Sequence, residues 1–564
     1  MKKLKKIVQF SLLILFTLVI KNNVNAQIIS PHFFGQNAWM PDTIGNTVYY
    51  GKLHKEWGAI KNSSPNLIRF GGIGADKNMP TNFQYLKMID SIRANGMEPI
   101  IQVPFDKFAY NANQAADIVK FINITSNRNI KYWSIGNEPD LGYQYTSSSQ
   151  VATYLKSFSS AMKAMDPNIL IMGPECAWFN QTIIDGLTTP NGPDDVTGKD
   201  ANGRYYLDII SFHTYPFDGT QNRAGVISKL TSAGSLNDNL IHLNGRLTTC
   251  NTAHGRTGAT ALKSAITEAN IDYQNDAADN LYGVGANSFL GGQFWAEMMG
   301  VAMKNGVDFV NFWSVVEGNT NALNIGYIDG ATNNKKPTYY HFKMMAENFK
   351  GNYVNGTSTH GYVKSFGSQN TQQISVLVMN EDIGNNFNYT VRLNNSTVSG
   401  NNPVKININA NVGVEYNGTI PAQSTQLLVF NSTGALIKKY DYSLNTNAVA
   451  YQAPTLTNFV VATGTNDNTD GNGEITKDFQ INKVYPNPTN AKLNIVLNKS
   501  NWEQKEYGIE VFSMTGQLVF NKKADFVKGQ EEIDLSSASL ASAMYVVRVS
   551  YDDVLRTEKV MVIR

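Results

Sequence analysis

The chain has 564 residues, which is too long for one ordinary domain, and 42% of them are hydrophobic, enough to build a large core. Its formal charge is +2 and falls to −3 once residues 1–26, with five lysines and no acid, are removed. This balance excludes the concentrated basic surface of a nucleic-acid-binding protein. Two cysteines, Cys176 and Cys250, exclude a disulfide framework, and a single bridge between them stays open for an exported chain.

Residues 1–26 have the pattern of a signal peptide. Four lysines precede an apolar run over 7–20, and Val24-Asn25-Ala26 offers a small-residue cleavage site before Gln27. The run is shorter than the roughly 20 residues of a membrane span, and no later segment approaches that length. We therefore expect an exported protein with no stable membrane span.

Residues 27–350 alternate short apolar runs with longer amphipathic stretches, the pattern of a parallel sheet with crossover helices. The apolar runs predict strands at 32–35, 66–70, 99–103, 132–135, 169–172, 207–212, 264–267 and 309–312. The stretches between them predict helices at 84–95, 113–125, 148–165 and 290–305. Eight strands with intervening helices predict an α/β fold of the (β/α)8 TIM barrel type.

After residue 350 the sequence changes to short alternating strands separated by Asn, Gly and Thr turns. This pattern predicts a β-sandwich domain over 351–443. Residues 444–477 are polar and rich in turn formers, as is typical of a linker. Residues 478–564 return to short alternating strands and predict a separate C-terminal all-β domain.

Two carboxyl groups stand at strand ends of the predicted barrel. Glu138 follows the fourth strand, within Asn137-Glu138-Pro139, and Glu268 ends the seventh strand. Barrel enzymes keep their sites at the mouth formed by these strand ends. Hydrolysis of a glycosidic bond needs such a pair, one acid and one nucleophile, about 5 to 5.5 Å apart when configuration is retained.

The Asn137-Glu138-Pro139 strand end, Glu268, and His213-Thr214-Tyr215 on the sixth strand together resemble glycoside hydrolase clan A over residues 27–350. The resemblance implies that Glu138 is the acid/base and Glu268 the nucleophile of a secreted retaining glycoside hydrolase. It also implies that Asn137 holds the sugar 2-hydroxyl.

Further candidates for substrate binding stand at the same predicted mouth. Arg69 resembles the clan's arginine that orients the nucleophile, and its planar fork suits a carboxylate. His213 and Tyr215 are expected to hydrogen-bond the nucleophile or the sugar, and Trp313 to stack on a sugar ring. Glu175 and Glu317 follow strands five and eight; Glu175 is assigned to substrate binding, and Glu317 has an equivalent position.

The C-terminal domain resembles the sorting domain of the type IX secretion system of Bacteroidetes. The resemblance rests on Val484-Tyr485-Pro486-Asn487-Pro488, on 509–517 and on Tyr545-Val546-Val547-Arg548-Val549. It implies passage across both membranes to the cell surface or medium, with the secretion machinery as a partner. A generic β-sandwich or a carbohydrate-binding module is the alternative.

The expected partner is thus a polysaccharide or oligosaccharide with β-glycosidic bonds. No metal or cofactor is expected, because the strand ends carry no metal-ligand cluster, phosphate loop or Ser/His/Asp pattern. The alternative from another class is a non-catalytic cell-surface glycan-binding protein on a barrel scaffold. Glu268 is followed by Ala269-Asn270-Ile271, which departs from the Glu-Tyr-Gly and Glu-Trp patterns of several families in the clan, so the sugar and linkage stay open.

Overall fold

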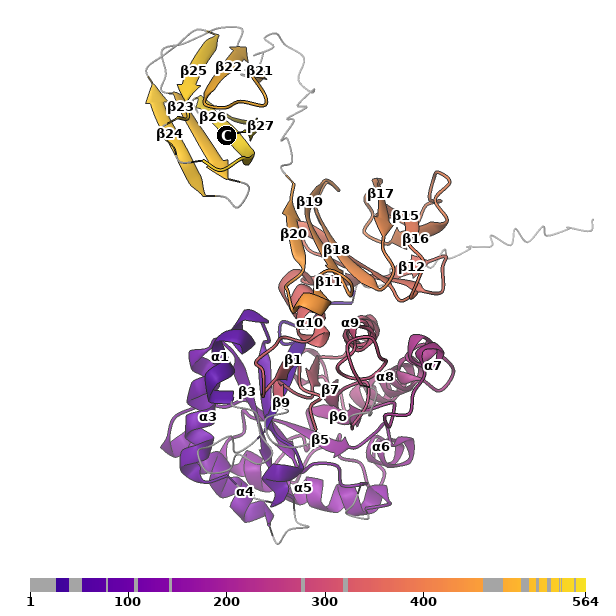
Figure 1. The fold of residues 1–564 in the computed structure, drawn as a ribbon. Helices are drawn as coiled ribbons and strands as arrows, with labels where there is room; N and C mark the ends of the chain where they lie inside the picture. The colour runs from indigo at the N-terminus through magenta and orange to yellow at the C-terminus, as the bar shows by residue number, and fades with distance from the viewer. Residues whose placement is uncertain are drawn as a thin grey trace, which may run out of the picture. The chain divides into compact units, whose positions relative to one another are not determined.

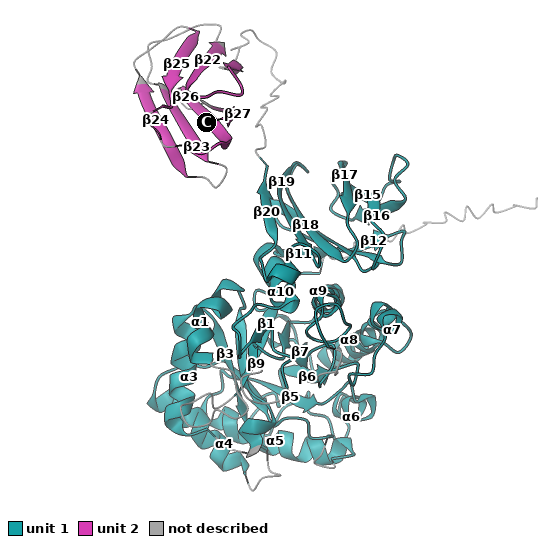
Figure 2. Ribbon diagram, viewed as in Figure 1, with its two compact units in different colours: residues 1–462 teal, residues 463–564 magenta. Residues whose placement is uncertain are grey.

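The computed structural model describes residues 27–39, 53–77, 80–105, 110–141, 145–274, 279–317, 323–459, 480–498, 507–513, 517–524, 529–536, 538, 540–551 and 554–563. The predicted signal peptide lies outside these residues. The chain divides into two compact units, residues 1–462 and 463–564 (Figure 2). Among the described residues no helix is both long and apolar enough to cross a membrane.

The first unit begins with a closed barrel of eight parallel strands, each hydrogen-bonded to the next, with β1 also paired to β8 (Figure 1). This confirms the predicted fold class. The strands are β1 (Phe34–Trp39), β2 (Leu67–Gly71), β3 (Glu98–Val103), β4 (Tyr132–Ile135), β5 (Leu170–Cys176), β6 (Ile209–Thr214), β7 (Lys263–Ala269) and β8 (Phe309–Phe312).

Helices surround this barrel (Figure 1). They are α1 (Leu53–Asn62), α2 (Ile73–Lys77), α3 (Asn82–Ala94), α4 (Ala112–Val119), α5 (Ser148–Met165), α6 (Gln181–Leu187), α7 (Arg223–Ser228), α8 (Leu236–Ala253), α9 (Phe289–Lys304) and α10 (Pro337–Asn348). The predicted helix at 113–125 begins as α4 and continues as a π-helical segment, Lys120–Thr125. A 3₁₀ turn, Gly258–Thr260, precedes β7, and two short strands, β9 (Val316–Glu317) and β10 (Ile328–Asp329), pair after β8.

Local sequence fixes where several of these helices begin. The Thr81 hydroxyl accepts a hydrogen bond from the Gln84 N–H, and the Gln84 side-chain carbonyl accepts one from the Thr81 N–H. The two bonds form a capping box for α3. Ser147 caps α5 in a simpler way, by accepting from the Gln150 N–H. These caps satisfy N–H groups that the first helical turn leaves without partners.

The rest of the first unit is a two-sheet β-sandwich. Its six-stranded sheet has the order β11 (Asn352–Val354), β13 (Val363–Gln369), β14 (Gln373–Asn380), β18 (Ser424–Asn431), β19 (Leu436–Ser443), β20 (Thr455–Asn458). Its four-stranded sheet has the order β12 (Gly356–Ser358), β16 (Val404–Ile408), β15 (Phe387–Arg392), β17 (Glu415–Ile420).

The sandwich extends further than the sequence indicated. Residues 444–458 were expected in the linker, but they include a 3₁₀ turn, Ala448–Ala450, and β20, which pairs with β19. The polar composition of this stretch misled the prediction, because β20 is an edge strand whose residues are exposed. The remaining predicted linker, 460–477, lies outside the described residues.

Barrel and sandwich share one hydrophobic core, which runs from the barrel through α9 and α10 to Leu377, Met379 and Leu427 of the six-stranded sheet. Polar contacts cross the same boundary. The buried Gln293 amide on α9 donates to the Asn380 and Ser424 carbonyls at 3.1 and 3.0 Å. The two parts therefore pack as one body within the first unit.

The second unit has a separate core, formed by residues between Val484 and Val562. A three-stranded sheet has the order β21 (Gln480–Tyr485), β22 (Lys492–Asn498), β25 (Gln530–Asp534). A four-stranded sheet has the order β24 (Leu518–Ala524), β23 (Tyr507–Ser513), β26 (Ala543–Tyr551), β27 (Val554–Val562). Its all-β character agrees with the prediction from sequence.

Candidate active site

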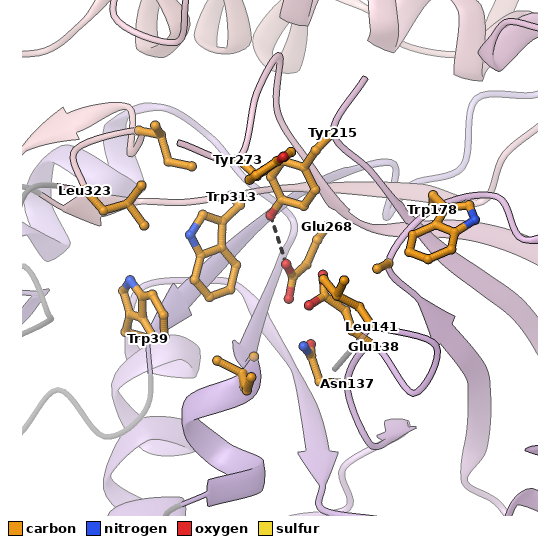
Figure 3. A pocket seen from close by; sticks show the side chains of 14 residues that line it. Trp39, Asn137, Glu138, Leu141, Trp178, Tyr215, Glu268, Tyr273, Trp313 and Leu323 are labelled. Carbon is orange, nitrogen blue, oxygen red and sulfur yellow. Dashed lines mark hydrogen bonds between the residues drawn. The ribbon is translucent and has the colours of Figure 1, made fainter. Parts of the chain in front are cut away.

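Glu138 and Glu268 meet at the mouth of the barrel (Figure 3). One carboxylate oxygen of each, together with a ring nitrogen of His213, lie within 4.8 Å of one another. Glu268 is carried by β7, whereas Glu138 stands three residues beyond the end of β4. An approach inside this limit is compatible with the roughly 5 to 5.5 Å between carboxyl groups at which one can protonate a leaving oxygen while the other attacks the sugar.

The backbone at this mouth adopts conformations that side-chain-bearing residues rarely take. Glu138 has φ +49° and Glu175 has φ +59°, both in the left-handed region. Gly136 has φ +73°, and a Cβ there would lie 2.7 Å from the Phe105 ring. The Glu138 N–H donates to the Glu175 carbonyl at 2.9 Å, which ties the β4 and β5 ends together. Strain of this kind concentrates at functional sites.

Arg69 lies beneath the carboxyl pair and is fully buried. Its Nη1 donates to Glu268 Oε1 at 2.8 Å and to Asn37 Oδ1 at 3.1 Å. Its Nη2 donates to Asn137 Oδ1 at 2.9 Å and lies 3.3 Å from Glu175 Oε2. The guanidinium thus holds both the Glu268 carboxylate and the amide beside Glu138 in fixed orientations.

His213 on β6 stands among three carboxyl groups. Its Nδ1 lies 3.0 Å from Glu138 Oε1 and 3.6 Å from Glu268 Oε2, and its Nε2 lies 3.2 Å from Glu175 Oε2. Burial disfavours the charged imidazolium, but Glu268 and the other two carboxyls outweigh it and raise the pKa of His213 to about 10. At neutral pH both ring nitrogens therefore donate hydrogen bonds.

Glu268 is held by donors on both oxygens. Tyr215 Oη donates to Oε2 at 2.9 Å, opposite the Arg69 contact on Oε1. Burial raises the pKa of Glu268, against the lowering effects of His213 and Arg69. Burial and the charge of Glu268 raise the pKa of Tyr215 well above its usual range, so the phenol remains a donor.

Two indoles form a wall of the mouth on the Glu268 side. Trp39 and Trp313 meet edge to face, with ring centroids 4.6 Å apart. Their N–H groups both donate to Glu317 Oε1, at 2.7 and 2.9 Å, which fixes the two rings. Gly72, with φ +81°, leaves room for the Trp313 ring, since a Cβ there would lie 2.8 Å from the ring edge.

These groups enclose a cavity of about 500 Å³. Its lining combines the two carboxyls with aromatic and aliphatic side chains: Trp39, Gly72, Ile73, Asn137, Glu138, Leu141, Ala177, Trp178, Tyr215, Glu268, Tyr273, Trp313, Leu323 and Ile325. A largely apolar cavity with a few convergent polar groups is the usual form of a small-molecule or sugar site.

The residues predicted from sequence fall into two layers around this cavity. Asn137, Tyr215 and Trp313 line it with the two carboxyls, whereas Arg69, His213 and Glu175 lie behind them. The assignment of Glu175 to direct substrate binding does not fit this geometry. Its side chain is fully buried, and Arg69, His213 and Ser211, whose Oγ donates to Oε1 at 2.8 Å, occupy its oxygens.

Several site residues were not singled out from the sequence. Trp39 is the last residue of β1, and an aromatic residue at a strand end was the available sequence signal for it. Gln102 accepts from Arg69 Nη2 at 3.1 Å and from the Gly72 N–H at 2.7 Å. A polar residue inside the apolar run 99–103 was the available signal for it. Trp178 gave no such signal, because its place at the mouth depends on a turn that sequence does not fix.

Glu138, His213 and Glu268 are also close enough together to bind one divalent cation. Their present hydrogen bonding opposes that use. Arg69 and Tyr215 already donate to the two oxygens of Glu268, so a cation here would have to replace those hydrogen bonds. The arrangement therefore favours carboxyl chemistry over a metal site.

Comparison with known proteins separates the two units. A family model described as "Secretion system C-terminal sorting domain" matches residues 483–563. No curated protein sequence matches the chain.

Two solved structures share the fold of the first unit. A GH51 α-L-arabinofuranosidase from Thermotoga petrophila RKU-1 is 14% identical, covers 72% of this chain and 97% of its own, and gives a TM-score of 0.51. A family 44 xyloglucanase from Paenibacillus polymyxa is 15% identical, covers 73% and 98%, and gives 0.50. At these identities the likeness concerns the fold. Residues 483–563 thus match a secretion system C-terminal sorting domain, and the first unit shares its fold with these two glycoside hydrolases.

Proposed function

We propose that this protein is a secreted glycoside hydrolase that cleaves β-glycosidic bonds of a polysaccharide or oligosaccharide with retention of configuration. The observation that carries the proposal is the approach of Glu138 and Glu268 within 4.8 Å at an aromatic-lined cavity. The sorting domain indicates delivery to the cell surface or medium, where the enzyme would encounter such glycans. The predicted signal peptide completes this route.

Charge balance in the cluster supports separate roles for the two carboxyls. Three carboxyl groups face two cations, Arg69 and His213, so a neutral cluster retains one carboxylic proton. Glu268 accepts from both Arg69 and Tyr215, an arrangement that favours its anion. Glu138 accepts from His213 and lies at the open side of the mouth, with 17% of its side chain exposed. Glu138 is therefore the carboxyl that the leaving group of a bound substrate can reach.

The reaction would run in two displacements. Glu268 attacks the anomeric carbon while Glu138 protonates the departing oxygen, which gives a glycosyl ester on Glu268. The neutral ester no longer repels negative charge, so Glu138, now a carboxylate, can take a proton from water as that water attacks. Asn137 is held by Arg69 close to both carboxyls, where its amide can bond the sugar 2-hydroxyl. Trp313 offers a ring face to the sugar.

Dinitrophenyl β-glycosides of glucose, xylose, galactose, mannose and arabinose test this proposal, because dinitrophenol leaves without protonation. Glu138→Ala should still release dinitrophenol. It should regenerate free enzyme only slowly, since no base then activates water. Added azide should accelerate it and give a β-glycosyl azide. Glu268→Gln should release no dinitrophenol, with or without azide. Glu381→Gln, a buried carboxyl away from the mouth, is the matched control.

The outcomes separate the possibilities. A β-glycosyl azide from Glu138→Ala supports the assignment. A β-glycosyl azide from Glu268→Ala, together with an azide of inverted configuration from Glu138→Ala, would reverse the roles of Glu138 and Glu268. A wild type that binds glycans but hydrolyses no member of the panel would identify a non-catalytic glycan-binding protein instead.

A further inference from the structure

Exposed apolar side chains gather around the cavity. Trp178, Leu141 and Tyr273 are 47%, 52% and 54% exposed, and all three line the same cavity as the carboxyl pair. Large apolar groups left in water at a concave site are typical of binding surfaces. None of the three has a role in the two-carboxyl chemistry described above, so they bear on what else the site binds.

Trp178 lies on the Glu138 side of the mouth. In Figure 3 the side chains run across the cavity from Trp313 through Glu268 to Glu138, and then to Trp178 at the opposite edge. Contacts support this order at both ends. A Cβ on Gly72 would lie 2.8 Å from Trp313 and 3.9 Å from Glu268 Oε1, so these two groups adjoin.

At the other end, the turn that carries Trp178 is bonded to the loop that carries Glu138. Asp140, two residues after Glu138, accepts from the Ala177 N–H at 2.9 Å through Oδ1. Through Oδ2 it accepts from the Asn180 amide at 3.0 Å. Both flanks of Trp178 are thus fixed to the acid/base loop, and the indole keeps its place without being covered by the protein.

In a retaining mechanism the two sides of the mouth hold different parts of the substrate. The glycosyl unit that becomes bonded to Glu268 lies against Trp313, and the departing group lies beyond Glu138, which protonates it. An amphipathic indole face at that second position suits the apolar face of a sugar ring, with the ring hydroxyls left in water. A small leaving group such as an alcohol would leave the platform uncovered.

We propose that Trp178 is the stacking platform for a sugar ring on the leaving-group side, so that the natural substrate carries saccharide on both sides of the cleaved bond. The Asp140 bonds position this platform relative to Glu138. The inference rests on the proposed function. Because the second half of the reaction uses the same side of the mouth, a sugar on Trp178 can also accept the glycosyl unit in place of water.

That transfer is the basis of the test. The C1–O bond to Glu268 breaks, a C1–O bond to an acceptor hydroxyl forms, and the hydroxyl proton goes to the Glu138 carboxylate. The donor is the β-glycosyl fluoride of the sugar that the dinitrophenyl panel selects, because fluoride needs no stacking platform. The acceptor is the methyl β-glycoside of the same sugar. The measured quantity is the ratio of transfer product to hydrolysis product.

Trp178→Ala should lower this ratio at least about tenfold at fixed acceptor concentration, since an anchoring aromatic contact is lost. Trp178→Phe should retain most of the transfer because it keeps a ring face. Tyr282→Ala, which removes a side chain 64% exposed and outside the cavity lining, should leave the ratio unchanged.

A Trp178→Ala protein with the wild-type ratio, or a wild type that hydrolyses the fluoride but transfers nothing, would overturn the inference alone. A wild type that does not hydrolyse the fluoride would overturn the proposed function, and the inference with it. Partial unfolding of Trp178→Ala would lower both products together. Because the ratio of transfer to hydrolysis does not depend on the amount of folded enzyme, an unchanged ratio in the remaining active protein still counts against the platform.

Discussion

Two clusters of buried carboxyl groups with cations occur in the first unit. The mouth cluster consists of Glu138, Glu175, Glu268, Arg69 and His213. The interface cluster lies where the sandwich meets the barrel and consists of Glu297, Glu381, Lys364 and Arg223. Lys364 Nζ lies 2.6 Å from Glu297 and 3.3 Å from Glu381, and Arg223 donates to the Glu381 carbonyl at 2.9 Å.

Both clusters shift titration strongly. Burial raises the pKa of Glu381 to about 8 despite the Lys364 charge, as the three carboxyls raise that of His213 to about 10. What distinguishes them is access. The mouth cluster borders a cavity with aromatic walls, whereas the interface cluster is enclosed between α9, β13 and the end of β14. Perturbed carboxyls alone therefore do not identify an active site.

The largest expected difference between the two clusters is the effect on kcat of replacing Glu268 or Glu381. Glu268→Gln should lower kcat by at least about 10⁴-fold, the scale seen when a covalent nucleophile is removed from a hydrolase. Glu381→Gln should leave kcat within about threefold of wild type, because an amide resembles the protonated carboxyl that its raised pKa favours. Steady-state kinetics on the active dinitrophenyl glycoside give both values. Comparable losses in the two variants would contradict the separation.

Lys364 should act on stability instead. Lys364→Met leaves the Glu297 carboxylate buried without the cation that lies 2.6 Å from it, which should cost about 3 to 5 kcal/mol of unfolding free energy. Denaturant titration at neutral pH measures the change. Adding Glu297→Gln and Glu381→Gln to Lys364→Met should recover most of it, since no charge then remains buried. Wild-type stability in Lys364→Met would show that solvent reaches the interface cluster.

The same interface contains a group that senses acid. His341 on α10 lies 2.8 Å from the Pro337 carbonyl through Nδ1 and 2.8 Å from Thr425 Oγ1 through Nε2. Burial lowers its pKa from 6.5 to about 4. As the pH falls, His341 therefore takes up its proton in the unfolded chain before it does so in the folded chain. Its contribution to the free energy of unfolding is complete above pH 6.5 and declines toward pH 4, by up to about 3 kcal/mol.

His341→Gln should lack this decline. The quantity to measure is the difference in unfolding free energy between wild type and variant from pH 7 to pH 4.5, because Glu381 titrates in the same range with the opposite sign and cancels in the difference. A difference that does not change with pH would show that His341 is not buried as a neutral ring.

The smallest effect is expected from removing the second unit. Both clusters lie within residues 69–381, and the second unit has its own core. A chain ending at residue 462 should keep kcat/KM and the main unfolding transition, and lose export across the outer membrane. Activity assays and calorimetry check the first two, and fractionation of the producing cells checks the third. An insoluble or inactive product would show that the first unit depends on the second.

The sequence predicted the elements that depend on local pattern and missed those that depend on tertiary contact. The 148–165 helix has its predicted bounds, because a Ser cap and a regular apolar stripe define it. The strand predicted at 32–35 lies instead at Phe34–Trp39, since Gln36 and Asn37 inside it are polar. Both side chains are buried although they point to opposite sides of the barrel wall, a fact that periodicity does not contain.

The site shows the same division. Glu138 and Glu268 could be placed at the mouth because strand ends of a barrel converge. Arg69, His213 and Glu175 were also placed at the mouth, but their mutual contacts could not be predicted, since only the closed barrel brings Gln102 and Glu175 to Arg69. Trp178 was missed because its position depends on Asp140, and no rule of spacing connects a turn after one strand with the loop after another.

The core shared by barrel and sandwich has a consequence for how the chain can be divided. Leu377, Met379 and Leu427 belong to the same hydrophobic cluster as α9 and α10, so the sandwich completes the core around these helices and is not a detachable module. A boundary drawn at residue 350, where the barrel pattern ends in the sequence, would leave the outer faces of α9 and α10 open to solvent. Recombination with other catalytic domains is therefore expected to succeed after residue 459.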